Sequence, residues 1–170
     1  MKKALIIIIS LAALVLLILY FIPISYPLKK TMTAIEIRHN DPQHIVQREI
    51  QIDGQYSLYL FKPDSFRGDL VIEGYDFTKN HEPSEIQIQN ETTMLAYFKF
   101  GDDFGIIPFG PLLATRNFRE VFIGVYENNG WGGGDGLSLF APASTKGEAK
   151  AVWQTLSSID PWVGASNWPE

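Results

Sequence analysis

Residues 44–61 read HIVQREIQIDGQYSLYLF, and this stretch sets the fold class of the chain. Ile50 and Ile52 alternate with polar neighbours, which is the period of two typical of a half-buried strand. The Asp-Gly pair at 53–54 favours a tight turn between antiparallel strands. The stretch therefore predicts a β-hairpin whose returning strand covers residues 56–61.

The same period of two continues through most of the chain that follows. Further strands are expected at residues 69–77, 85–89, 93–100, 119–127 and 136–140. These segments are rich in the β-branched and aromatic residues that strands favour, and turn residues separate them. About seven strands in this arrangement predict a mainly β fold, either an antiparallel β-sandwich or a barrel.

One helix is expected near the C-terminus. Thr145 and Glu148 have the spacing of a capping box, in which each side chain satisfies a backbone N–H of the first helical turn. The apolar stripe that follows at helical spacing consists of Ala149, Val152, Trp153 and Leu156. This amphipathic helix would pack across a sheet face or close a barrel end. Residues 160–170 lack any period, so we expect loop or partly disordered chain there.

The N-terminal part of the chain predicts a membrane anchor. Residues 4–22, ALIIIISLAALVLLILYFI, are uncharged and follow Lys2 and Lys3 directly. As a helix they would span roughly 28 Å, close to the roughly 30 Å of a bilayer's hydrocarbon core. A cleaved signal peptide has a shorter apolar region followed by small residues, a pattern that is missing here. A cleaved signal and a buried soluble helix remain the alternatives.

The expected order of segments follows from this anchor. Residues 1–3 form a short cytoplasmic N-terminus, and residues 4–22 cross the membrane as a single-pass helix. Residues 23–43 are expected to be a tether, because two prolines stop the helix and HNDPQ at 39–43 is turn-like. Residues 44–170 form one β-rich domain. Basic residues flank the anchor on both sides, and the very short N-terminal tail favours an extracytoplasmic domain.

Charge and composition limit the partners of this domain. Of the 14 basic residues, four lie at positions 2, 3, 29 and 30, whereas all 19 acidic residues follow Thr31. The chain from Thr31 onward therefore carries a net charge of −9. Such a domain repels phosphate backbones, so we expect no nucleic acid partner. The chain has no cysteine, which excludes disulfides and thiolate metal sites.

Two segments carry a resemblance to a protein family. They are GQYSLYLFKPDSFRGDLVIEGYDFT at 54–78 and LFAPASTKGEA at 139–149. Both resemble small uncharacterised membrane-anchored or exported β-domain proteins of Gram-positive bacteria. The resemblance implies a location at the cell envelope and a compact β-rich domain behind a short anchor or signal. It implies no activity and no functional residues.

Three acidic residues are candidate metal ligands. Asp102 and Asp103 are adjacent within FGDDFG, where a turn could direct both carboxylates at one hard cation. Asp135 lies in GWGGGDGL at 130–137, which comes close to the calcium-binding nonapeptide pattern but is present in a single copy. The alternatives are turn residues in the first case and a flexible glycine loop in the second. We expect no cofactor.

Three tryptophans outside the expected strands and helix are candidate ligand-binding residues. Trp131, Trp162 and Trp168 could stack on a sugar ring or dock a partner, or they could instead cap the core or lie at the membrane interface. The sequence contains no recognised catalytic motif. We therefore expect a non-catalytic binding or interaction module. It would bind membrane lipid through residues 4–22, with an envelope protein or cell-wall glycan as a further partner. The alternative is a surface hydrolase or metal-binding enzyme that uses loop carboxylates.

Overall fold

The computed structural model describes residues 2–100, 104–127, 136–165 and 168. Its strands are β1 (Ile24–Arg38), β2 (Asp41–Leu58), β3 (Asp64–Ile72), β4 (Glu82–Pro83), β5 (Ile86–Ile88), β6 (Thr93–Lys99), β7 (Gly105–Ala114), β8 (Val121–Val125) and β9 (Leu137–Ala141). Its helices are α1 (Lys2–Phe21), α2 (Phe77–Asn80), the 3₁₀ turn η1 (Arg116–Phe118), α3 (Lys146–Ile159) and α4 (Pro161–Ala165).

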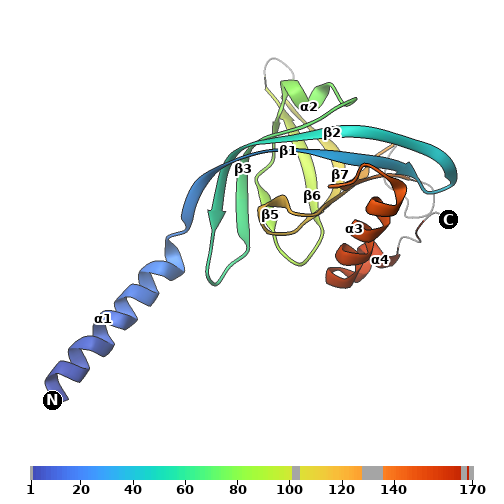
Figure 1. Ribbon diagram of the computed structural model, residues 1–170. Coiled ribbons are helices and arrows are strands. Elements are labelled where there is room, and N and C mark those ends of the chain that lie inside the picture. The colour runs from blue at the N-terminus through green and yellow to red at the C-terminus, as the bar shows by residue number, and fades with distance from the viewer. Residues whose placement is uncertain (1, 101–103, 128–135, 166–167, 169–170) are drawn as a thin grey trace.

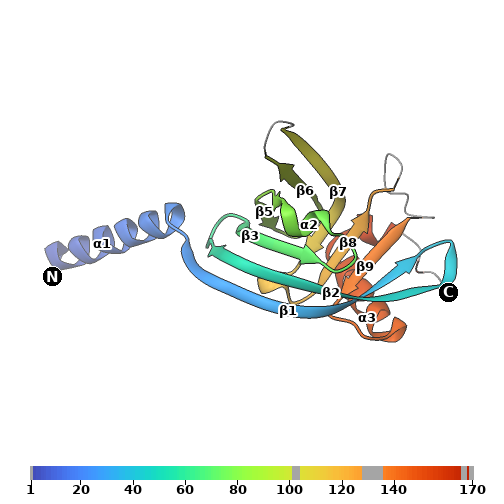
Figure 2. The ribbon, with the colours of Figure 1, turned by 90° about the horizontal axis from the view of Figure 1, so that it is seen from above.

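The described strands form a single antiparallel sheet that curls into a nearly closed barrel (Figures 1 and 2). The strand order is β4-β6-β7-β8-β9-β1-β2-β3-β5. The N-terminal meander β1-β2-β3 joins the C-terminal meander β6-β7-β8-β9 where β9 pairs with β1. The expectation of a mainly β antiparallel fold with a C-terminal helix is therefore confirmed.

The two ends of the sheet approach each other on the side of β4 and β5. The hydroxyl of Tyr97 on β6 donates a hydrogen bond of 2.6 Å to the carbonyl of Leu70 on β3. Burial raises the pKa of Tyr97, so this phenol stays protonated and remains a donor. The bond links the ends across the gap that ladder pairing leaves open.

Two apolar cores lie on the two faces of the curled sheet. Inside the barrel, buried aromatic and aliphatic side chains fill the interior, and the largest of them are Tyr56, Phe66, Tyr97, Phe109 and Phe118. On the outer face of β1, β8 and β9, α3 contributes a second core. Helices α3 and α4 thus form a second layer that covers only part of the barrel (Figure 1).

The predicted strand count was too low, because the described part of the chain contains nine strands where about seven were expected. The largest error concerns the expected tether, since residues 24–38 of that segment form β1. Pro27 is tolerated because β1 pairs with β2 along its length but with β9 only from Ile35 to Arg38. At Pro27 the strand therefore has one open edge, where a missing N–H breaks no second ladder. The turn expected near residues 39–43 is present between β1 and β2.

The prediction of a hairpin turn at Asp53 and Gly54 is also wrong, because β2 continues through both residues. Gly54 faces Gly68 of β3 directly across the ladder. A Cβ on either glycine would overlap the opposite backbone, and Gly68 has a φ of 153°. Gly54 and Gly68 therefore allow β2 and β3 to approach closely, which is a common role of glycine within a strand.

The prediction also missed β7, whose sequence GIIPFGPLLA is interrupted by Pro108, Gly110 and Pro111. The β6–β7 register shifts between Leu95 and Ala96. Such a bulge accommodates residues that a regular ladder would reject. The proline and glycine residues that interrupt the period of two in β7 therefore coincide with a bulge in the β6–β7 pair.

The predicted C-terminal helix is confirmed as α3. The Thr145 side chain accepts a hydrogen bond of 3.2 Å from the backbone N–H of Glu148, and Ala149, Val152 and Leu156 are buried. The Glu148 carboxylate reaches back to the N–H of Ser144 instead of that of Thr145. The irregular tail expected after residue 160 contains a short helix, α4.

Helix α1 comprises 20 residues and projects from the barrel without joining either core (Figure 1). Its large apolar side chains are exposed, including Ile6, Leu11 and Leu17. Within the described residues, which leave out the side chains at positions 2, 4, 5, 18 and 19, no helix qualifies by length and hydropathy as a membrane span.

Candidate ligand-binding site

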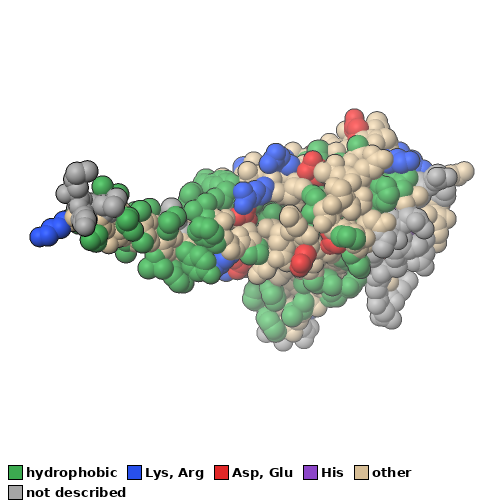
Figure 3. Space-filling model, turned by 90° about the horizontal axis from the view of Figure 1, so that it is seen from below, with side chains coloured by type: hydrophobic (Ala, Val, Ile, Leu, Met, Phe, Trp, Pro, Cys, Tyr) green, Lys and Arg blue, Asp and Glu red, His purple; other side chains and the backbone are tan. Residues whose placement is uncertain are grey.

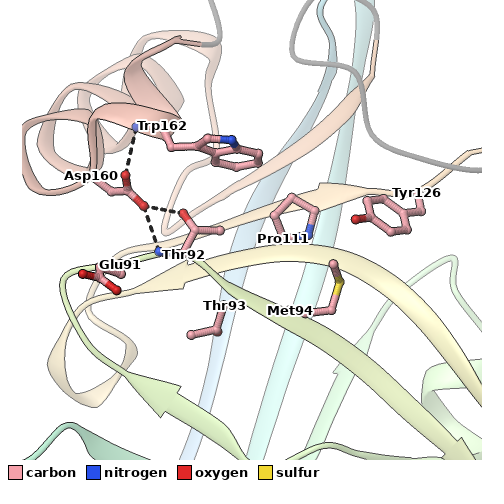
Figure 4. A pocket seen from close by; sticks show the side chains of 8 residues that line it. All are labelled: Glu91, Thr92, Thr93, Met94, Pro111, Tyr126, Asp160 and Trp162. Atoms are coloured by element: carbon pink, nitrogen blue, oxygen red, sulfur yellow. Dashed lines mark hydrogen bonds between the residues drawn. The ribbon is translucent and has the colours of Figure 1, made fainter.

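A surface pocket of about 380 Å³ lies where the helical layer ends and the outer barrel face becomes accessible (Figure 4). It opens between α4 on one side and β6 and β7 on the other. Its lining combines apolar and polar side chains: Glu91, Thr92, Thr93, Met94, Pro111, Tyr126, Asp160 and Trp162. Its volume falls within the range of small-molecule sites, about 300–1,000 Å³.

Asp160 holds the two sides of this pocket together. Its Oδ2 accepts hydrogen bonds from the Thr92 backbone N–H at 2.8 Å and from the Thr92 hydroxyl at 2.6 Å. Its Oδ1 accepts a bond of 2.8 Å from the backbone N–H of Trp162, in the manner of a helix N-cap. One carboxylate thus connects the start of β6 with the start of α4.

The charge of Asp160 is favoured by these contacts. Partial burial alone would raise the pKa of its carboxyl, but the hydrogen bonds from Thr92 and Trp162 outweigh burial and lower the pKa. The carboxylate is therefore ionised, and it holds both Thr92 and the backbone of Trp162. Its role in the pocket is to position the wall that carries Trp162.

The rest of the wall is mainly apolar. The Trp162 indole is 44% exposed and lies edge-on to Phe122 of β8, with ring centroids 6.5 Å apart. Met94, on the facing strand, is opposite Pro111 in the β6–β7 ladder. In Figure 4, Pro111 lies between Trp162 and Tyr126. Pro111 itself is buried, so the accessible flat surfaces are those of the Trp162 indole and the half-buried Tyr126 ring, which are suited to stacking on a ring-shaped ligand.

The residues singled out in the sequence have different locations. Trp162 lines the pocket, whereas Trp168 packs against Phe140 and Trp153, with ring centroids 5.4 and 5.8 Å apart. Trp168 is thereby part of the outer core. The remaining candidates, Trp131, Asp102, Asp103 and Asp135, lie outside the described residues.

The sequence interpretation missed most of the lining, above all Thr92, Pro111 and Asp160. One signal was available, because Asp160 followed by Pro161 is a common start of a helix, with proline at the first helical position. Nothing local connects Asp160 with Thr92, which is 68 residues away in the chain. The pocket is thus a product of tertiary structure.

A second polar cluster surrounds the buried Glu36 of β1. Its carboxylate accepts hydrogen bonds from the Tyr75 hydroxyl at 2.7 Å and from Arg48 at 3.1 and 3.2 Å, and His44 Nε2 lies 3.1 Å away. Desolvation alone would raise the pKa of Glu36, but these contacts lower it. Because both oxygens of Glu36 accept hydrogen bonds within the protein, we assign this carboxylate a role in stabilising the fold.

The described residues provide no candidate metal centre. Among them, no three His, Asp or Glu side chains lie close enough together to coordinate one ion. The three aspartates proposed as metal ligands from the sequence are not among these residues.

Comparison with known proteins yields no match to a family model, to a curated protein or to a solved structure.

Proposed function

We propose that this chain is a membrane-anchored, extracytoplasmic binding protein of the cell envelope that acts without catalysis. The observation that carries the binding role is the pocket beside Trp162, where the exposed indole and the half-buried Tyr126 ring lie among polar lining residues. The apolar run at residues 4–22 supports the location. The sequence resemblance to exported β-domain proteins of Gram-positive bacteria implies no activity, and it agrees with the proposed location alone.

The ligand that fits this pocket best is a sugar ring of the cell-wall glycan. Sugars have one apolar face of C–H groups and a periphery of hydroxyls, and aromatic side chains bind that face by stacking. Glu91, Thr93 and Tyr126 are polar residues in the lining of the same pocket, and the hydroxyls of a stacked ring would need partners of this kind. The alternative hydrolase relies on the loop carboxylates at 102, 103 and 135, which lie outside the described residues.

A binding experiment on the full chain in detergent tests the glycan proposal. Soluble cell-wall fragments are titrated against the wild type, Trp162→Ala and, as a control, Phe104→Ala. Phe104 is 69% exposed, directly precedes β7 and does not line the pocket. Loss of one aromatic stacking contact weakens binding by about 3- to 10-fold.

The expected result is that Trp162→Ala binds the fragments more weakly by this factor, while Phe104→Ala binds like the wild type. If the wild type binds no fragment, the glycan proposal fails. Equal binding by Trp162→Ala and the wild type would show that any glycan binds elsewhere. Binding to an envelope protein and to no glycan would make the pocket a protein interface.

The anchor is tested separately by Leu11→Arg, which places a charge in the middle of the apolar run. An arginine at the centre of a membrane helix disfavours insertion by about 3 kcal/mol. We expect much of this variant to leave the membrane fraction, whereas Ile106→Arg, on the exposed surface of β7, stays with it. Retention of Leu11→Arg under alkaline extraction would contradict a single-pass anchor.

A further inference from the structure

The β2–β3 loop lies directly beside the C-terminal end of α1. Leu60 and Phe61 at its tip are 51% and 58% exposed, which is unusual for two consecutive large apolar side chains. The Phe61 ring lies 5.8 Å from the ring of Tyr20. Lys62 extends over Tyr20 and Phe21, with its Nζ 5.2 and 5.6 Å from the two ring centroids.

From this arrangement we infer that the β2–β3 loop is a second membrane contact, which lies in the bilayer interface next to the anchor. This inference rests on the proposed role of α1 as a membrane anchor. Leu60 and Phe61 would insert at the level of the uppermost acyl chains. Lys62 would extend outward to the lipid phosphates.

The depth of the loop follows from the length of α1. The helix has 20 residues and is therefore about 30 Å long, the thickness of the hydrocarbon core. Tyr20 is one residue from its end and is thus at the boundary between acyl chains and headgroups. Phe61, in ring contact with Tyr20, lies at the same depth. Tyrosine, tryptophan and lysine are enriched at this level of membrane proteins.

The exposed apolar surface of the β2–β3 loop is continuous with that of α1, which indicates that the same lipid bilayer covers both. The apolar surface passes from Phe21 and Ile22 at the end of α1 to Ile24 of β1 and onward to the loop, and all of these side chains are more than half exposed. Figure 3 shows hydrophobic side chains along α1 continuing onto the base of the barrel. A bilayer that surrounds α1 therefore meets the loop without any rearrangement.

Basic groups lie where the lipid headgroups would be. Lys62 and Arg116 line a second pocket of about 280 Å³ next to the loop. Arg116 pairs with the buried Asp64, with Nε and Oδ2 3.0 Å apart, yet its side chain is 60% exposed. Anionic headgroups would attract both cations. The apolar tip and the basic flank together form the two-layer surface that interfacial membrane contacts require.

Single-cysteine spin labelling tests the inference, since the chain has no native cysteine. The full chain is reconstituted in vesicles that contain phosphatidylglycerol, with a label at Phe61→Cys, Leu11→Cys or Ile106→Cys. Phe61 and Ile106 are similarly exposed, at 58% and 60%, but Ile106 lies on the β6–β7 hairpin, which projects away from α1 (Figure 2). Accessibility to lipid-soluble oxygen and to a water-soluble nickel chelate gives the depth of each label.

We expect the labels at Leu11 and Phe61 to be reached by oxygen severalfold better than by the nickel chelate, with Leu11 the deeper. The label at Ile106 should show the reverse. A water-exposed label at Phe61, with Leu11 in lipid, would overturn the loop contact and leave the anchor intact. A water-exposed label at Leu11 would overturn both proposals. Lipid contact at Ile106 as well would mean that the barrel lies flat on the bilayer, which contradicts the placement inferred here.

Discussion

Glu36 shows how one buried charge can be stabilised in this barrel. Its side chain is 2% exposed, and removal of an ion from water is costly unless partners replace the lost hydration. Arg48 and Tyr75 provide these partners from β2 and from the segment after β3. The carboxylate therefore connects three consecutive parts of the N-terminal meander.

We predict that Glu36→Gln destabilises the fold by about 3 kcal/mol, because it leaves the partly buried Arg48 without its counter-ion. The matched control is Glu85→Gln, since Glu85 pairs with Arg67 on the surface, where the two side chains are 45% and 80% exposed. That change should alter stability by no more than about 0.5 kcal/mol. Urea unfolding of both variants measures the difference, and equal stability of the two would contradict the assigned role of Glu36.

The same carboxylate predicts a pH dependence. The pKa of Glu36 is lowered in the folded state, so the unfolded chain binds the proton more readily. The stability that Glu36 contributes is therefore fully present above the unfolded pKa of about 4.3 and is lost as pH falls through the lower folded pKa. We expect the stability gap between wild type and Glu36→Gln to be constant from pH 6 to about pH 5 and to narrow below about pH 4. A stability difference that grows as the pH falls would contradict the lowered pKa of Glu36.

At the scale of elements, the β2–β3 pair depends on two facing glycines. Gly54 and Gly68 bring the backbones together in the part of the sheet that curls, and a side chain on either would overlap the opposite strand. The Asp-Gly pair at 53–54 resembles a hairpin turn locally. In the folded protein β2 and β3 approach closely at this point, so the Asp-Gly pair lies within the continuous 18-residue strand β2.

We predict that Gly68→Ala destabilises the protein by about 3 kcal/mol, because both backbone strain and overlap with the facing strand oppose it. Gly147→Ala is the matched control. A Cβ there meets nothing closer than 3.9 Å and the residue lies in α3, so stability should rise by about 0.5 kcal/mol. Thermal unfolding separates the two, and a neutral Gly68→Ala would show that the strands can separate without loss.

At the scale of the whole molecule, β1 holds the two meanders together. It pairs with β2 along its full length and with β9 from Ile35 to Arg38, and Ile35 and Ile37 also belong to the outer core. By contrast, no described side chain of α1 belongs to either core. The boundary between α1 and the β-rich domain is therefore near residue 23, some 20 residues earlier than a tether would place it.

We predict opposite outcomes for two truncations. A chain that begins at residue 23 should unfold cooperatively with a Tm close to that of the full chain, because both cores remain complete. A chain that begins at residue 39 lacks β1 and should not fold, since β2 and β9 would both lose a partner. Circular dichroism during heating distinguishes these states. Cooperative unfolding of the shorter chain would restore the tether interpretation of residues 23–43.

Local features of the fold were predictable from the sequence. The period of two identified β2, β3, β5, β6, β8 and β9 in outline, and the capping box at Thr145 located α3. Such features depend on neighbours within a few residues, so the physical cause is present in the sequence itself. Proline and glycine misled the interpretation, because their local preference for turns was overridden at Pro27 and Gly54 by strand pairing.

The candidate site was predictable only at Trp162. Its other walls come from residues whose contacts span long stretches of chain, as in the bond between Thr92 and Asp160. Burial and hydrogen bonding across such distances depend on how the sheet curls and where the helical layer ends. No local pattern encodes that geometry.

By itself, the sequence determined the antiparallel β class, the capped C-terminal helix and the apolar N-terminal segment, because each follows from the spacing of neighbouring side chains. Only the tertiary structure decided that residues 24–38 complete the sheet, that the sheet curls into a nearly closed barrel, and that α4 and β6 enclose a pocket. These features depend on pairing between distant segments. Such pairing is favourable only when the strands and both cores form together.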